Sequence, residues 1–162
     1  MLHFTLESAH MDPTQRLAAL QAEYFHLQKT VEDFDGKALT IKAWSITFSM
    51  AVLVGAFTSH ARPVLLVASA ASLLFWILEA VWKSFQLGYY NRIEIIELHY
   101  RSPSGELPPL QVNEAWMARW NNTHWSEVWR MAWWPHIALP HAVVVAGGAI
   151  LYVLARSGTI AV

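Results

Sequence analysis

The chain has 162 residues, of which 55% are hydrophobic and only 14% charged, and its formal net charge is −1. Soluble domains carry about 25% charged residues, so the composition argues against an ordinary soluble domain, and the lack of a basic excess argues against nucleic-acid binding. Because no Cys is present, disulfides and thiolate metal sites are excluded.

Residues 1–12 are expected to form a tail. They contain neither Lys nor Arg and no apolar run of signal-peptide length, so no cleaved signal is expected. A long helix can begin directly afterwards. Asp12 suits an N-cap, and Pro13 suits the first helical position, where its missing N–H costs nothing.

Residues 13–42 predict a helical stalk with one apolar seam. Apolar side chains recur there at alternating spacings of three and four, as in a coiled coil. Gly36 falls on the opposite side, and the seam continues in phase beyond it, so we expect a continuous helix. The seam comprises Leu17, Leu20, Tyr24, Leu27, Val31, Phe34, Ala38 and Ile41.

Residues 43–60 predict the first transmembrane helix. They contain no Asp, Glu, Lys or Arg, and the stretch is long enough to cross the roughly 30 Å hydrocarbon core of a bilayer. Small residues recur at every fourth position, which lets another helix approach closely. This ridge predicts packing against the protein's own second span or, alternatively, a subunit contact or pore lining. It comprises Ala43, Thr47, Ala51, Gly55 and Ser59.

A tight turn at 60–63 leads into the second transmembrane helix, predicted at 64–82. Glu79 lies near its end, and an ionisable residue within a span is a functional hypothesis by default. Lys83 follows four residues later, so the two side chains can form an ion pair on one helix face. That pair is the structural alternative.

Residues 83–101 are predicted to continue this helix into the cytoplasm, where it returns antiparallel to the stalk and packs on the seam. A register with Lys42 opposite Lys83 leaves about a dozen residues of the stalk, roughly 18 Å, beyond the end of the returning helix. On this overhang Leu17, Leu20 and Tyr24 are expected to be exposed, as a contact surface for a partner.

Residues 102–136 predict a linker and Trp-rich helices. Asn113 is the expected cap of a first short helix, which the segment 121–123 ends. Trp favours the headgroup region because its ring is amphipathic, so we expect 113–134 to lie along the membrane surface. The interfacial side chains would be Trp116, Trp120, Trp125, Trp129 and Trp133.

Residues 137–156 complete the pattern as a third transmembrane helix. The predicted fold is therefore an all-α polytopic membrane protein with three spans and a cytoplasmic helical hairpin. Nine Lys and Arg lie before the first span or between the second and third, against two elsewhere. This bias predicts a cytoplasmic N-terminus and an external C-terminus. The expected location is the inner (cytoplasmic) membrane.

Eight His are present, but no two have the i, i+3 or i, i+4 spacing of metal ligands on one helix. His136 and His141, at the mouth of the third span, are the candidates for a metal or haem, with His99 or Glu79 as a further ligand. An interfacial His needs no ligand to explain it, so no cofactor is expected. No GxSxG, HExxH or P-loop pattern supports an enzyme activity.

The stalk, the two spans joined by the turn at Arg62 and Pro63, and the returning helix resemble small bacterial membrane effectors of the SLATT type. These are encoded beside nucleotide-signalling and antiphage modules. The resemblance covers residues 13–101 and implies a membrane-disrupting effector that a cytoplasmic signal releases or assembles. The third span and the Trp-rich segment depart from that plan.

Three functions are consistent with these patterns. The first is an oligomeric, membrane-perturbing or channel-like effector controlled through its stalk, with lipids and further copies of the chain as partners. The second is a non-enzymatic membrane anchor that docks a cytoplasmic protein. The third is a His-ligated membrane cofactor protein.

Overall fold

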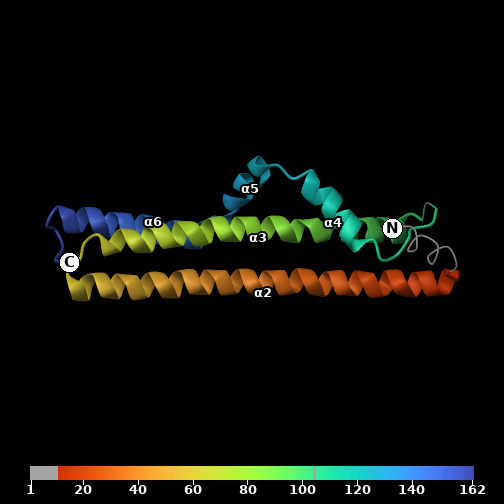
Figure 1. The fold of residues 1–162 in the computed structure, drawn as a ribbon, viewed down its shortest axis with the longest axis horizontal. Helices are drawn as coiled ribbons and strands as arrows, with labels where there is room; N and C mark the ends of the chain where they lie inside the picture. Colours follow the sequence, from red (N-terminus) through yellow and green to blue (C-terminus); the bar gives the residue numbers. More distant parts are fainter. Residues whose placement is uncertain (1–10, 104) are drawn as a thin grey trace. The chain divides into compact units, whose positions relative to one another are not determined.

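The computed structural model describes residues 11–103 and 105–162, and the predicted tail lies almost entirely outside them. Within these ranges every regular element is a helix, which confirms the all-α class (Figure 1). The helices are α2 (Pro13–Ser59), α3 (Val64–Arg101), α4 (Val112–Asn121), α5 (Trp125–Ala132) and α6 (Pro135–Arg156).

The chain divides into two compact units, to both of which α2 and α3 contribute. The first unit comprises the residues up to Asp35 together with Phe85–Thr123. The second unit comprises Gly36–Ser84 and His124–Val162. Each unit has its own packed interior, so the two are described in turn.

The start of α2 follows the sequence prediction. The Thr14 backbone N–H donates to Asp12 Oδ1 at 3.3 Å, so Asp12 satisfies one of the free N–H groups of the first turn. The helix also continues through Gly36 without a break, as the phase of the seam predicted. Likewise α3 runs uninterrupted to Arg101, where the sequence predicted the end of the returning helix.

The seam of α2 forms the core of the first unit. Leu20, Leu27 and Val31 are buried against two residues of α3, Ile93 and Ile96. The returning helix therefore packs on the seam, as predicted. Each of these side chains is at most 6% exposed, so the seam is an internal contact of the chain.

The prediction of a free overhang is wrong for two of its three residues. Leu20 is only 1% exposed, and the Tyr24 hydroxyl donates to Glu97 Oε1 at 2.9 Å. Leu17 alone is exposed, at 49%. The error comes from the register: Tyr24 meets Glu97, one helical turn before Arg101, which the predicted register places opposite it, so α3 reaches further along α2 than predicted.

A buried ion pair fastens the Pro-rich connection to the first unit. Arg92 donates through Nε to Glu23 Oε1 at 2.8 Å and through Nη2 to Oε2 at 3.2 Å. The same guanidinium donates to the Pro108 carbonyl oxygen at 2.8 Å. Glu23 Oε2 also accepts the Leu110 backbone N–H at 2.7 Å. Two buried charges thus hold two points of the connection between α3 and α4.

Helix α4 packs on α3 at a glycine. A Cβ at Gly88 would collide with the indole ring of Trp116, so the ring occupies the space that glycine leaves. Trp116 Nε1 donates to the Phe85 carbonyl oxygen at 3.0 Å. The predicted cap at Asn113 is wrong: α4 starts at Val112, its N-cap position is Gln111, two residues earlier than predicted, and no side chain caps it.

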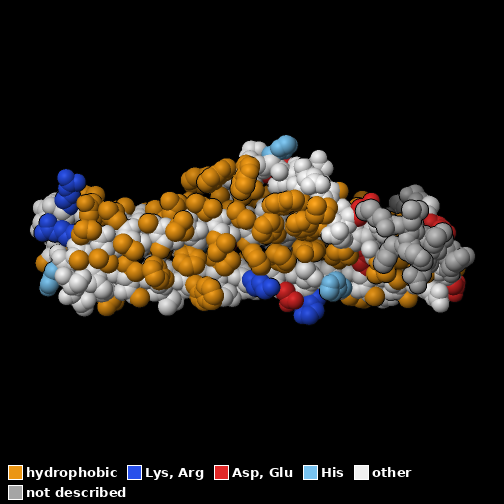
Figure 2. Space-filling model, in the orientation of Figure 1, with side chains coloured by type: hydrophobic (Ala, Val, Ile, Leu, Met, Phe, Trp, Pro, Cys, Tyr) orange, Lys and Arg blue, Asp and Glu red, His pale blue; other side chains and the backbone are white. Residues whose placement is uncertain are grey.

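In the second unit, three long helices supply apolar segments. α2, α3 and α6 each contain a stretch long and apolar enough to cross a membrane. Hydrophobic side chains cover much of the visible surface (Figure 2). Exposed large hydrophobic residues of these helices include Ile46, Phe48, Leu74, Val143 and Ile150. A surface of this kind suits a lipid environment, where the apolar face needs no further burial.

Helix α6 approaches α3 closely at Gly148. A Cβ there would collide with Ser69 Oγ and lie 3.1 Å from the Leu65 carbonyl oxygen. Ser69 Oγ donates in turn to the Val145 carbonyl oxygen at 3.1 Å. The neighbouring Gly147 has open space at its Cβ position, so only one of the two adjacent glycines is required by packing.

We therefore expect Gly148→Leu to lower the free energy of unfolding by about 1–3 kcal/mol, because the larger side chain forces α6 away from α3. Gly147→Leu is the matched control and is expected to change it by less than about 0.5 kcal/mol. Thermal unfolding of both variants in the same detergent, followed by circular dichroism, measures the difference. Equal melting temperatures would contradict the close approach at Gly148.

Candidate functional site

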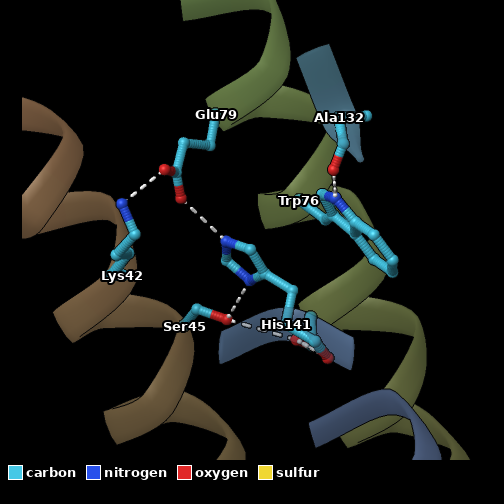
Figure 3. A network of polar contacts seen from close by, with 7 residues as sticks. Lys42, Ser45, Trp76, Glu79, Ala132 and His141 are labelled. Atoms are coloured by element: carbon cyan, nitrogen blue, oxygen red, sulfur yellow. Dashed lines mark hydrogen bonds and ion pairs between the residues drawn. The ribbon is translucent and has the colours of Figure 1, made fainter. Parts of the chain in front are cut away.

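The second unit contains a charged cluster centred on Glu79, whose side chain is only 2% exposed. Its two carboxylate oxygens are held by different helices (Figure 3). Lys42 Nζ, from α2, donates to Oε1 at 2.5 Å. His141 Nε2, from α6, lies 3.0 Å from Oε2. The carboxylate of α3 therefore links the three long helices.

His141 is fully buried, and its second ring nitrogen is also paired. Nδ1 lies 3.2 Å from Ser45 Oγ, which in turn is 3.4 Å from Ser72 Oγ. The Ser72 hydroxyl donates to the backbone carbonyl oxygen of His141 at 3.3 Å. The imidazole thus stands between a carboxylate on one side and two hydroxyls on the other.

An aromatic side chain closes one flank of the cluster. The ring of Trp76 stacks on the imidazole of His141 with 6.4 Å between centroids and 16° between planes. Trp76 Nε1 donates to the Ala132 carbonyl oxygen at the end of α5, at 2.7 Å. Since both rings have fixed partners, the imidazole has a defined orientation.

The helical repeat brings these residues together. Lys42, Ser45 and Ser49 lie at i, i+3 and i+7 on one face of α2. Ser72, Trp76 and Glu79 have i, i+4 and i+7 spacing on α3. All except Lys42 and Trp76 are buried. Each helix therefore presents one polar face to the others and an apolar surface elsewhere.

The charges in the cluster balance in one protonation state. With His141 neutral, the Lys42 ammonium and the Glu79 carboxylate sum to zero. Burying charges is unfavourable unless they are paired and hydrogen-bonded, and here each oxygen of Glu79 has a partner. Protonation of His141 would add one positive charge, which the same carboxylate faces. The arrangement can therefore hold a proton or exchange one between imidazole and carboxylate.

The sequence prediction connected Glu79 and His141 only as possible ligands of one metal or haem. It paired Glu79 with Lys83, whereas the structure gives both oxygens of Glu79 to other helices. It proposed His141 together with His136 for a metal, and His136 is exposed. In the part of the chain that the structure describes, no three His, Cys, Asp or Glu side chains are grouped as metal ligands.

Lys42, Ser45 and Ser72 were missed as site residues. A usable signal was present, since Lys42, Ser45 and Ser49 are the polar residues of one face of α2, one turn after another. The small residues at every fourth position, which were singled out instead, lie on the neighbouring face of α2.

Among the described residues, the small-residue ridge of the first span does not pack on another helix, so the first of its two predicted roles, packing on the protein's own second span, is wrong. Four of its five residues are exposed, Gly55 is half-buried and nothing lies within 4 Å of a Cβ built at Gly55. The inward face of α2 is formed instead by Ser45, Ser49 and Ala56. The ridge comprises Ala43, Thr47, Ala51, Gly55 and Ser59.

The five predicted interfacial Trp residues fall into two groups. Trp116 and Trp120, on α4, are half-buried, and both contact Phe85 of α3. Trp125, Trp129 and Trp133 lie on or directly after α5 and are 57–73% exposed. The second group alone has the exposure that an interfacial role requires.

Comparison of the chain with protein-family models, with curated proteins and with solved structures gave no match.

Proposed function

We propose that the protein is a multi-pass protein of the inner membrane that crosses the bilayer three times. The three apolar helices support this, and so does the position of their apolar segments within one unit. The Lys and Arg bias supports a cytoplasmic N-terminus and an external C-terminus. In this topology Lys42 and Glu79 lie at the cytoplasmic border of the spans.

Within the membrane, we infer a channel-like effector whose working site is the cluster of Lys42, Glu79 and His141. One observation carries the proposal: a fully paired carboxylate is buried where three apolar helices meet. Apolar side chains of similar volume would hold the helices together at least as well, because desolvation offsets most of the attraction in a buried ion pair. Ionisable residues in spans mark ion pathways and proton relays.

The proposal includes assembly into a homo-oligomer through the ridge of α2. Small residues on an outward face allow close helix approach in a bilayer, where packing drives association. Because Leu20 and Tyr24 are engaged within the chain, the stalk seam no longer supports a contact with a cytoplasmic protein. Assembly is therefore assigned to the spans.

Two single-cysteine variants test this assembly, since the natural chain has no Cys. We expect Ala51→Cys to form disulfide-linked dimers on oxidation in membranes, because Ala51 is exposed on the ridge. Ala56→Cys is the matched control on the same helix: Ala56 is 0% exposed and should stay monomeric. Gel electrophoresis without reductant measures the yield of disulfide-linked dimer for each variant. Equal yields from the two positions would exclude the ridge as the contact.

Ion flux in liposomes tests the effector function. Purified protein is reconstituted, a potential is applied, and the movement of protons, potassium and chloride is followed with separate dyes. Flux above that of protein-free liposomes supports a channel-like effector. Its absence for all three ions, with the protein inserted and folded, would overturn the proposal in favour of a membrane anchor.

A further inference from the structure

We propose that the ion handled at the cluster is a proton and that His141 is the group that takes it up. This inference rests on the proposed function, since it names the substrate of the same site. It is carried by the hydrogen bonds around the imidazole, which fit two protonation states with the same heavy-atom positions.

In the first state His141 is neutral and its Nε2–H donates to Glu79 Oε2. Nδ1 then has a free lone pair, which accepts the Ser45 hydroxyl across 3.2 Å. The Ser72 hydroxyl donates to the His141 carbonyl oxygen. Every donor of these three side chains has an acceptor, and the cluster with Lys42 has no net charge.

In the second state a proton is bound at Nδ1, and Nδ1–H donates to Ser45 Oγ. The Ser45 hydroxyl hydrogen turns to Ser72 Oγ, 3.4 Å away, and Ser72 still donates to the His141 carbonyl oxygen. The chain of donors again ends on an acceptor. Rotation of one hydroxyl hydrogen is thus enough to accommodate the proton, and no side chain has to move.

The imidazole can also pass the proton on. A new N–H bond forms at Nδ1 while the Nε2–H bond breaks, and the released proton binds Glu79 Oε2. The charged groups that face His141 are Glu79 from α3 and, through that carboxylate, Lys42 from α2. Lys83 is the next cation along α3, and α5 reaches the flank through the Ala132 carbonyl on Trp76. The carboxylate therefore stabilises the extra positive charge.

A second observation extends the polar path along α2. Ser49 lies one turn beyond Ser45, is 2% exposed, and its hydroxyl has no hydrogen-bond partner among the described residues. A buried hydroxyl without a partner is unfavourable. Lys42, Ser45 and Ser49 span about 10 Å of the helix at 1.5 Å per residue. A polar face of that length leads from the cluster towards the middle of the first span.

Proton and potassium fluxes in proteoliposomes, measured side by side, test the inference. We expect proton flux in the natural protein and a loss of about tenfold or more in His141→Gln, because the charged imidazole bond is removed. Ser45→Ala should also reduce proton flux, and Ser45→Thr should retain it because the hydroxyl remains. His136→Gln, an exposed position on the same helix, is the control and should leave it unchanged.

Nitrogen NMR of ¹⁵N-His protein in nanodiscs gives a readout that needs no flux. The His141 signals, assigned by their loss in His141→Gln, should change from one protonated ring nitrogen to two as the sample is acidified stepwise from neutral pH. Potassium or chloride flux without proton flux would overturn the inference while leaving the proposed function standing. Unchanged His141 signals over this range would overturn it as well. Absence of all flux would overturn the proposed function, and the NMR titration would then decide proton binding by itself.

Discussion

Glu79→Leu is expected to lower the free energy of unfolding by about 3–5 kcal/mol, because it leaves the Lys42 ammonium without its buried counter-charge. The imidazole N–H of His141 loses its acceptor in the same step. Unfolding in detergent with increasing sodium dodecyl sulfate, followed by circular dichroism, measures the change. Glu94→Leu, an exposed position on the same helix, is the control and should shift stability by less than about 0.5 kcal/mol.

A triple variant separates the effect of charge on stability from the effect of packing. Replacing Lys42, Glu79 and His141 together by Met, Leu and Phe removes every charge of the cluster and keeps similar volumes. We expect this triple variant to recover most of the lost stability, because apolar replacement of a whole buried ion pair is often neutral or stabilising by about 1–4 kcal/mol. A triple variant as unstable as Glu79→Leu would show that the cluster is required for folding.

Arg92→Leu is expected to destabilise the first unit by a similar amount, about 3–5 kcal/mol. Glu23 is only 4% exposed and would keep the Leu110 N–H as its one remaining partner described above. The Pro108 carbonyl oxygen would lose its donor as well, so the connection before α4 should become susceptible to proteases. Limited proteolysis and thermal unfolding measure the two effects.

Two further variants test this explanation. Arg101→Leu removes an exposed guanidinium at the end of the same helix and should change stability by less than about 0.5 kcal/mol. The double variant Glu23→Leu/Arg92→Leu should be more stable than Arg92→Leu, since no unpaired charge remains buried. If the double variant is the less stable of the two, loss of packing rather than an isolated carboxylate explains the effect.

Much of the fold could be predicted because it depends on local chemistry. The N-cap at Asp12, the continuous helix through Gly36 and the end of α3 follow from residue types and helical phase alone. The packing of α3 on the seam followed from the heptad spacing. The three apolar helices were evident from runs without charged residues.

The candidate site could be predicted only in part, because it depends on register. The predicted register placed Lys42 opposite Lys83 and left Glu79 to pair with Lys83 on its own helix. A shift of one helical turn brings Lys42 of α2 opposite Glu79 instead. Sequence spacing detects pairs within one helix, whereas His141 follows Glu79 by 62 residues. The ridge containing Gly55 likewise had two predicted roles, because composition does not say which of two adjacent small faces of α2 packs inside.

Proton flux through the triple variant Lys42→Met/Glu79→Leu/His141→Phe tests the central claim most directly. The variant is reconstituted beside the natural protein at equal density, after circular dichroism has shown equal helix content. If the cluster is the working site, the variant inserts and folds but its flux falls to that of protein-free liposomes, because the three groups that exchange the proton are removed. Flux equal to that of the natural protein would contradict the account and leave the cluster as a structural contact between helices.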